Sequence, residues 1–129
     1  MTDPISDMLT QIRNAQAVLK SEILISFSGI KHEIAKILEK QKLIEKVEKK
    51  GKGVNKKLRI ILKYIDQKPA ISNLKKISKP GQRIYLPAKK IRNVRSGLGI
   101  AIISTSKGLI TNKQARKKNL GGEIICEIW

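Results

Sequence analysis

Five consecutive residues, Ser104-Thr105-Ser106-Lys107-Gly108, bring together three hydroxyl groups, a cation and a glycine. Two kinds of chemistry could use such a segment. A lysine three positions after a serine can activate that serine as a nucleophile. Alternatively, hydroxyl groups that donate and accept hydrogen bonds, next to a glycine that permits close backbone approach, can contact folded RNA. A third interpretation is a polar hairpin turn without any partner.

The catalytic interpretation lacks its supporting residues. The Ser-Asp-Asn and Lys-Thr-Gly elements that accompany such a serine are missing, and Ser104 precedes a hairpin glycine instead of opening a helix. His32 is the only histidine and has no cysteine or second histidine with which to bind a metal. The sequence also lacks a Gly-Lys-Ser or Gly-Lys-Thr loop for nucleotide phosphates. We therefore expect no enzyme, no cofactor and no metal site.

The charged residues are sorted along the chain. The 129 residues include 28 Lys and Arg against 10 Asp and Glu, a formal net charge of +18. Residues 67–122 hold 14 of the basic residues and no acidic residue, whereas an even distribution would place roughly four acids there. A lysine-rich surface kept for solubility explains the lysines but not the missing acids. This half of the chain is therefore predicted to bind a polyanion.

The composition favours folded RNA over an unpaired strand. The chain has one Phe, two Tyr and one Trp, too few for a platform on which unpaired bases stack. Hydroxyl side chains and close backbone approach suit the shallow minor groove and the 2′-hydroxyls of base-paired RNA. Lys107, together with Arg116 and Lys117 of the cluster Arg116-Lys117-Lys118, would neutralise phosphates at the margin of such a contact.

Residues 1–66 predict an α-β-α-β-β lobe. Asp3-Pro4 precedes an apolar stripe at helical spacing over residues 5–12, and a second helical stripe covers residues 30–38. A short alternating strand over 23–27 lies between these helices. The predicted hairpin has strands around 43–47 and 58–64, joined through Gly51-Lys52-Gly53.

Residues 67–129 predict a second, basic lobe built mainly from strands with one short helix. Thr111 and Gln114 have the spacing of a capping box at the start of that helix. The other predicted elements are a strand over 70–77, a tight turn over 79–82, a return strand over 83–86, a helical turn over 87–91, an exposed basic connection over 92–97, a buried strand from 100 and a final strand over 123–129. The predicted class is α+β with two small lobes.

The single cysteine and the apolar runs indicate the compartment. Cys126 alternates with Ile124 and Ile128, which favours a buried thiol over a metal ligand or nucleophile and predicts a reducing, cytoplasm-like location. No apolar run reaches the roughly 18 to 20 residues of a membrane-spanning helix. The start, Met1-Thr2-Asp3-Pro4, does not predict an export signal.

The closing segment carries a family resemblance. Ile103-Ser104-Thr105-Ser106-Lys107-Gly108, with Thr111, Ala115-Arg116 and Leu120-Gly121-Gly122-Glu123-Ile124-Ile125-Cys126, resembles the signature of bacterial ribosomal small-subunit protein eight. Three further segments are similar in order and spacing: residues 3–14, 78–85 and 97–100. The resemblance covers essentially the whole chain, and the two-lobe plan of that family agrees with the lobes predicted above.

The resemblance implies a ribosomal scaffold located on cytoplasmic ribosomes. It implies primary binding to an irregular hairpin in the central domain of small-subunit ribosomal RNA, contacts with neighbouring small-subunit proteins, and repression through a similar hairpin in the messenger of its own operon. By resemblance, residues 104–108 would enter the RNA helix beside its internal loop, with Tyr85 and Glu123 flanking them. For Tyr85, packing in the core is an equal alternative.

Three residues of the first lobe are weaker candidates for RNA contact. Arg13 and Asn14 end the polar side of the first helix, where they could reach the RNA backbone. Lys31 on the second helix could contact phosphate or lie on a solvated face. Two other functions stay open at this point: a nucleic-acid packing protein without site preference, and a translational repressor that never joins ribosomes.

Overall fold

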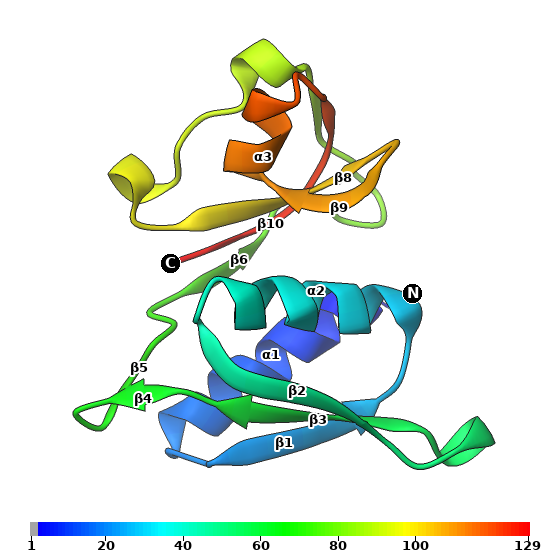
Figure 1. Ribbon diagram of the computed structural model, residues 1–129, viewed down its shortest axis with the longest axis vertical. Coiled ribbons are helices and arrows are strands. Elements are labelled where there is room, and N and C mark those ends of the chain that lie inside the picture. The colour runs from blue at the N-terminus through cyan, green and yellow to red at the C-terminus, as the bar shows by residue number, and fades with distance from the viewer. Residues whose placement is uncertain (1–2) are drawn as a thin grey trace. The chain divides into compact units, whose positions relative to one another are not determined.

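The computed structural model describes residues 3–129 and combines helices with antiparallel sheets (Figure 1). This confirms the predicted α+β class. Two compact units are present, residues 4–71 and residues 72–129 together with Asp3. The prediction that residues 1–66 and 67–129 are two domains stays a prediction. Met1 and Thr2 lie outside the described residues. They belong to the predicted first lobe and to the start of the chain, which does not predict an export signal.

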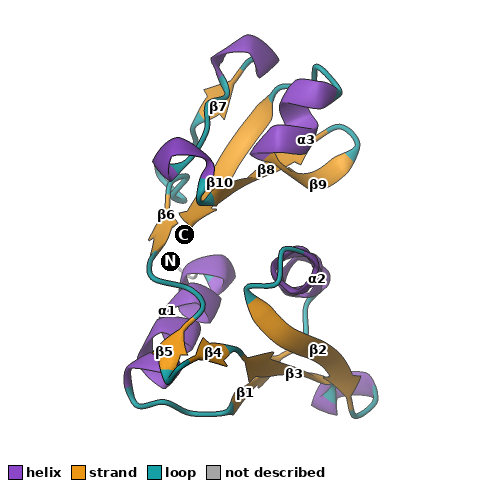
Figure 2. Ribbon diagram, turned by 60° about the vertical axis from the view of Figure 1, so that its left-hand side comes forward, coloured by secondary structure: helices purple, strands orange, loops and turns teal. Residues whose placement is uncertain are grey.

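Two amphipathic helices supply the core of the first unit. Helix α1 (Pro4–Ala17) begins at the predicted proline, and its apolar stripe, including Met8 and Ile12, is buried. Helix α2 (Gly29–Lys40) is capped by Ser28, whose hydroxyl oxygen accepts the Lys31 amide at 3.2 Å. Both helices lie on the same side of a three-stranded sheet (Figure 2).

That sheet has the strand order β1-β3-β2 and is antiparallel throughout. Its strands are β1 (Glu22–Ser26), β2 (Ile44–Lys50) and β3 (Lys57–Leu62). Leu58, Ile60 and Leu62 alternate as the buried face of β3, which is the pattern of a strand covered on one side. The predicted strands and their hairpin pairing are thus confirmed.

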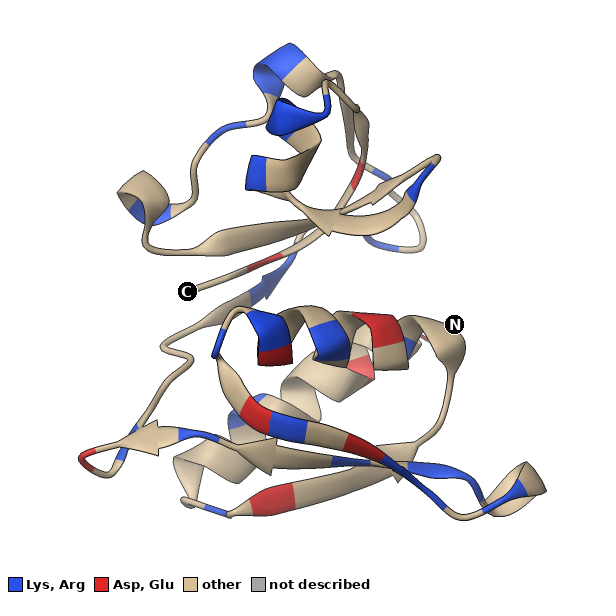
Figure 3. Ribbon diagram, viewed as in Figure 1, with Lys and Arg blue, Asp and Glu red and all other residues tan. Residues whose placement is uncertain are grey.

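An ion-pair network crosses these three strands. Arg59 of β3 donates two 2.8 Å hydrogen bonds to the Glu22 carboxylate of β1, and its Nη1 lies 3.8 Å from Glu48 Oε1 of β2. The hydrogen bonds from Arg59 hold the pKa of Glu22 below its ordinary value. Acidic and basic positions alternate along β2 in Figure 3. Three acids of this unit, Glu22, Glu39 and Glu48, lie in ion pairs with basic residues of the same unit.

Tight turns complete the first unit. The β2–β3 connection contains the 3₁₀ turn Gly53–Asn55, and a Cβ on Gly51 would come within 2.6 Å of the Asn55 carbonyl oxygen. Glycine is therefore required at position 51, where φ is +80°. Two short strands, β4 (Tyr64–Ile65) and β5 (Lys68–Pro69), pair through a two-residue turn in which Asp66 and Gln67 both have positive φ.

The second unit is built on a central strand, β10 (Gly122–Ile128). One edge of β10 pairs with β8 (Ile100–Thr105), which pairs in turn with β9 (Gly108–Thr111). The other edge of β10 pairs with β6 (Leu74–Lys76) and, further along, with β7 (Tyr85–Leu86). All of these pairings are antiparallel.

Three details of the predicted second lobe need correction. The strand expected over residues 70–77 is confined to Leu74–Lys76, and its expected return strand does not pair with it, because β6 and β7 both pair with β10. Strand β9 was not predicted, although the turn before it was. The helical turn expected over 87–91 is confirmed as Ala88–Lys90, and a second one, Arg95–Gly97, lies in the basic connection.

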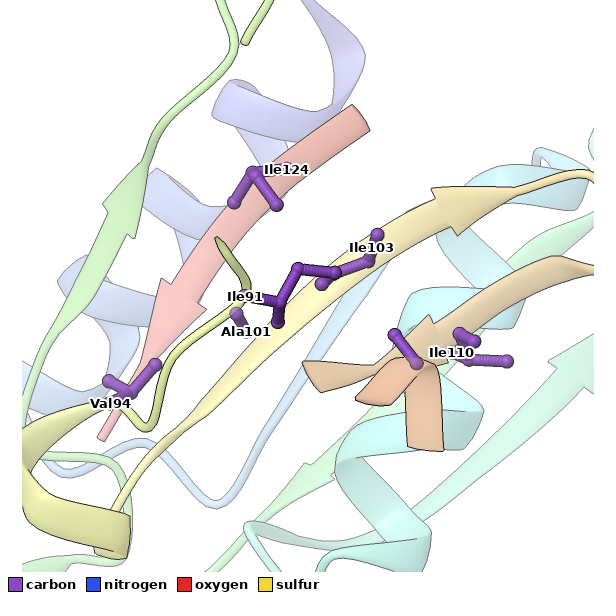
Figure 4. Packing of buried hydrophobic residues seen from close by; sticks show 7 residues of the cluster. Ile91, Val94, Ala101, Ile103, Ile110 and Ile124 are labelled. Carbon is purple, nitrogen blue, oxygen red and sulfur yellow. The ribbon is translucent and has the colours of Figure 1, made fainter. Parts of the chain in front are cut away.

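Helix α3 (Asn112–Lys117) and the 87–99 connection cover a small core. Thr111 and Gln114 form the predicted capping box. Figure 4 shows Ile91 beside Ala101 and Ile103 of β8, and these residues are at most 4% exposed. Cys126 is buried as predicted, and burial raises the pKa of its thiol to about 12.

Replacement of the buried Asn112 by alanine should destabilise the second unit. Asn112 Oδ1 accepts the Ala101 amide at 3.1 Å, and its Nδ2 donates to the Arg92 carbonyl at 3.0 Å. Asn112→Ala leaves the Ala101 amide and the Arg92 carbonyl without these bonds, so we expect a loss of about 2 to 4 kcal/mol in the free energy of unfolding by urea. The exposed neighbour Lys113→Ala should change it by less than about 0.5 kcal/mol. Equal effects of the two substitutions would contradict the assignment.

Candidate nucleic-acid interface

The hydroxyl segment forms the hairpin turn between β8 and β9. Thr105 and Gly108 are the last paired residues, so Ser106 and Lys107 make the turn. Thr105 Oγ1 donates to the Gly108 carbonyl at 2.9 Å and accepts the Lys107 amide at 3.0 Å. Gly108 has φ of +99°, which a residue with a side chain rarely adopts. The Thr105 hydroxyl therefore holds the turn together, while Ser106 and Lys107 are exposed.

Sheet register places Tyr85 and Glu123 beside this turn. Glu123 of β10 pairs with Tyr85 of β7 on one side and with Ser104 of β8 on the other. Residues opposite each other in adjacent strands project from the same face, so the three side chains form a row. Tyr85 is 66% exposed, which rules out the alternative that it packs in the core. Tyr85 and Glu123 thus lie on the strands next to Ser104, and their role as flanking contacts of the turn on RNA stays a prediction.

Gly122 allows β8 and β10 to come this close. A Cβ built at Gly122 would overlap the backbone carbonyl oxygen of Ser104, and a Cβ at Gly121 would lie 2.7 Å from the Leu86 carbonyl oxygen. Real Cβ atoms do not approach backbone oxygens to these distances. Gly122 therefore permits the short distance between β10 and β8, and Gly121 permits the short distance between the start of β10 and β7.

Two polar residues, Ser78 and Arg83, hold β7 and Glu123 in place. Ser78 is completely buried, and its hydroxyl accepts the Ile84 amide at 2.9 Å, which fixes the chain just before Tyr85. Arg83 Nη1 donates to Glu123 Oε2 at 3.1 Å. Because Arg83 neutralises this carboxylate, Glu123 can lie in a basic surface without repelling phosphates strongly.

The cations expected at the margin lie on the turn and on α3. Arg116 Nη2 donates to Asn93 Oδ1 at 2.5 Å, and Lys117 follows it on the exposed side of the helix. Neither Lys107 nor Lys117 forms an ion pair with any residue among 3–129. Residues 72–129 carry 13 Lys and Arg against two Glu, so most cations of this unit have no internal counter-ion.

The remaining predicted contacts lie in the other unit. Arg13 and Asn14 are exposed on α1. Lys31 is only 8% exposed, and its Nζ donates to Ser26 Oγ at 2.9 Å and to the Ser26 carbonyl at 3.3 Å. Two of the three N–H donors of this ammonium group are used within the fold, and burial limits access to the third. The structure therefore gives this ammonium group a role in holding β1 to α2, and the predicted RNA contact stays a prediction.

Comparison with known proteins identifies the family. The family model described as Ribosomal protein S8 matches residues 3–129. A small ribosomal subunit protein uS8 from Persephonella marina is 51% identical, covering 100% of this chain and 99% of the relative. Proteins of the same name from Mycoplasmopsis pulmonis and Synechocystis are 51% and 48% identical, each over 98% of its length. The chain belongs to the ribosomal protein S8 family.

Membership in the ribosomal protein S8 family agrees with the resemblance stated from the sequence. The family is structural and not enzymatic, as expected from the missing catalytic elements. Within residues 3–129, no helix has the length and apolarity needed to cross a membrane. The same residues contain no group of three His, Cys, Asp or Glu side chains arranged to hold a metal.

Sequence reasoning missed several residues that shape this ribosomal protein S8 surface. Ser78 and Gly122 were seen only as parts of turn or family segments, because their close contacts depend on strand pairing across the chain. Arg83 and Asn93 have no local signal at all. A sequence analysis could have suspected Arg83, since Glu123 is the first acid after 56 residues without one and would need a nearby cation.

Substitution at Gly122 tests the close approach of β8 and β10. Gly122→Ala should push these strands apart, lower the free energy of unfolding by about 1 to 3 kcal/mol or more, and weaken any ligand that contacts the row. Gly29→Ala is the control, because a Cβ there meets nothing within 4 Å and alanine favours the start of α2. Thermal unfolding measures both. A Gly122→Ala protein as stable as the wild type would contradict the geometry.

Proposed function

We propose that this chain is a primary RNA-binding component of the small ribosomal subunit, recognising an irregular helix in the central domain of the ribosomal RNA. The observation that carries the proposal is the row Tyr85-Glu123-Ser104 beside an exposed hydroxyl turn, on a unit with almost no acids. The relatives are named as small ribosomal subunit proteins, which supports the assembly. Neighbouring proteins of the same subunit are expected partners.

The hydroxyl turn suits a contoured minor groove. Ser104 and Ser106 make no side-chain hydrogen bond to any other residue in the described part of the chain, so both hydroxyls can donate to and accept from RNA. The turn is narrow because only Ser106 and Lys107 lie between its paired residues. Such a turn can contact 2′-hydroxyls and base edges where an internal loop widens the helix.

Tyr85 and Glu123 add recognition that a uniform duplex would not use. An exposed tyrosine ring can stack on a base or sugar that projects from the helix, and its hydroxyl can hydrogen-bond at the same time. The Glu123 carboxylate can accept from a base amino group or a 2′-hydroxyl. The Tyr85 ring and the Glu123 carboxylate therefore favour an irregular site. In a regular duplex, stacking and pairing leave few base faces and amino groups accessible to them.

The rival function is a nucleic-acid packing protein without site preference. A packing protein needs only cations to bind phosphates. The row Tyr85-Glu123-Ser104 and the hydroxyl turn instead supply hydrogen-bonding groups in fixed positions, which suit recognition of a particular site. Competition separates the two functions: a complex with the irregular small-subunit hairpin should survive excess regular duplex RNA or DNA at about 0.15 M salt. Equal displacement by both competitors would favour the packing protein. Co-sedimentation with purified small subunits tests the alternative of a repressor that never joins ribosomes.

Messenger control would use the same surface. If a hairpin in the operon messenger copies the irregular ribosomal site, the two RNAs should displace each other from one binding site. Simultaneous binding of both hairpins would place messenger control elsewhere on the chain or remove it.

Thr105 and Ser106 should separate turn stability from RNA reading. Ser106→Ala should leave unfolding unchanged but reduce discrimination between irregular and regular RNA by about 1 to 3 kcal/mol, because a partner on the RNA is left unpaired. Thr105→Val should also lower stability by about 1 kcal/mol, since it removes both hydrogen bonds inside the turn. Thr105→Ser is the control that keeps the hydroxyl. Unchanged discrimination in Ser106→Ala would remove the turn from the reading site.

Arg116 and Lys117 should act as phosphate contacts. Arg116→Ala and Lys117→Ala are each expected to weaken all RNAs similarly and to lower the slope of log affinity against log salt by about 1. Lys113→Ala on the same helix provides a comparison with the same charge change. Fluorescence anisotropy at several KCl concentrations measures the slope. An unaltered slope would place these two side chains away from the RNA backbone.

A further inference from the structure

The first unit carries its own concentration of positive charge at the end of the β2–β3 hairpin. Residues 49–57 contain five lysines and no acid, whereas the preceding part of β2 alternates acids and bases. Figure 3 shows this change along the hairpin, where blue segments but no red ones follow the alternating stretch. The lysines are Lys49, Lys50, Lys52, Lys56 and Lys57, which we call the hairpin lysines.

Most of the hairpin lysines have no internal counter-ion. Lys50 lies 3.4 Å from Glu48, which also pairs with Lys46 at 3.9 Å. Within residues 3–129, the other four hairpin lysines form no ion pair. Three of them, Lys49, Lys52 and Lys57, are exposed. The end of the hairpin is therefore a positive surface that the fold itself does not neutralise.

An aromatic residue gathers two of these cations. Lys56 Nζ lies 4.2 Å from the centre of the Phe27 ring, and Lys49 Nζ lies 5.6 Å from it. The His32 ring is 6.0 Å from Phe27, centre to centre. The ring face attracts cations, so Phe27 holds two ammonium groups near each other in spite of their repulsion.

The His32 imidazole lies among the positive charges of this surface. Its pKa lies below the ordinary value because of burial and of the positive charges of Lys49, Lys36 and Lys56, with Glu33 opposing them. An imidazole this close to lysines would add a further like charge on protonation. The lowered pKa agrees with surroundings in which burial and three lysines outweigh the single carboxylate of Glu33.

We infer that the hairpin lysines around Phe27 form a second RNA-binding surface, one that takes the phosphate backbone without regard to sequence. Lysine ammonium groups act as mobile point charges and lack the planar fork that reads a guanine or a carboxylate. The Phe27 ring already has the Lys56 and Lys49 ammonium groups and the His32 ring as neighbours, so we assign it to holding these cations and not to stacking on a base. Val54 is fully exposed at the loop but presents too little apolar area for a protein partner.

This inference rests on the proposed function only in naming RNA as the polyanion. The surface belongs to residues 4–71, whereas the hydroxyl turn belongs to residues 72–129. The two can therefore fail separately. A regular RNA duplex is the suitable probe, because it offers phosphates but no irregular site for the turn.

The test compares two double variants of the full chain with the same change of charge. Lys49→Gln with Lys56→Gln should lower the salt slope for duplex binding by about 2, one for each lost phosphate contact. Lys20→Gln with Lys68→Gln should leave the slope nearly unchanged, because both exposed lysines lie beyond the opposite end of β3 and neither is a hairpin lysine. Lys49→Arg with Lys56→Arg should restore the wild-type slope. An unchanged slope in the first variant, or equal losses in both glutamine variants, would overturn the inference.

The single histidine gives a second readout by NMR. Bound phosphates should raise the pKa of His32 toward its ordinary value, and this rise should persist in Ser106→Ala. No rise on duplex binding would overturn the inference while leaving discrimination by the turn intact. Conversely, loss of discrimination with the rise retained would refute the proposed function alone.

Discussion

The close approach of β8 and β10 at Gly122 is the constraint on which the interface depends. Any side chain at this position would overlap the Ser104 carbonyl oxygen, so the two strands would have to shift apart without glycine there. That pairing sets Glu123 between Ser104 and Tyr85 and thereby defines the row. A backbone contact that has no chemistry of its own therefore decides where the hydroxyl, carboxylate and phenol groups lie.

Repulsion among the lysines and arginines of residues 72–129 opposes the folding of this unit. The 13 cations of residues 72–129 face two glutamates, and their mutual repulsion opposes a compact state. The small apolar core around Ile103 and Ala115, both fully buried, and the buried hydrogen bonds of Asn112 must offset that repulsion. Binding of RNA phosphates would remove part of it, so this unit should be more stable in the complex than alone. In the proposed function, the lysines and arginines that oppose compaction are the ones that would bind phosphate.

Local signals in the sequence predicted the local structure well. The apolar stripe after Pro4 predicted α1, and the spacing of Thr111 and Gln114 predicted the capping box of α3, because both depend on residues within one or two turns. The hydroxyl turn and its glycine were also predicted. The partners of β6 and β7 were not predicted, since their pairing with β10 depends on contacts between distant segments. Lys31 shows the same limit: its residue type indicates phosphate binding, but its burial against Ser26 is decided by the packing of α2 on β1.

NMR mapping of backbone amides during titration with the irregular small-subunit hairpin tests the central claim most directly. The account predicts that the largest shift changes fall on residues 104–108 and on Tyr85 and Glu123, and that a regular duplex of equal length does not reproduce them. Changes confined to the lysine-rich segments, or identical maps for both RNAs, would contradict recognition by the row and the turn.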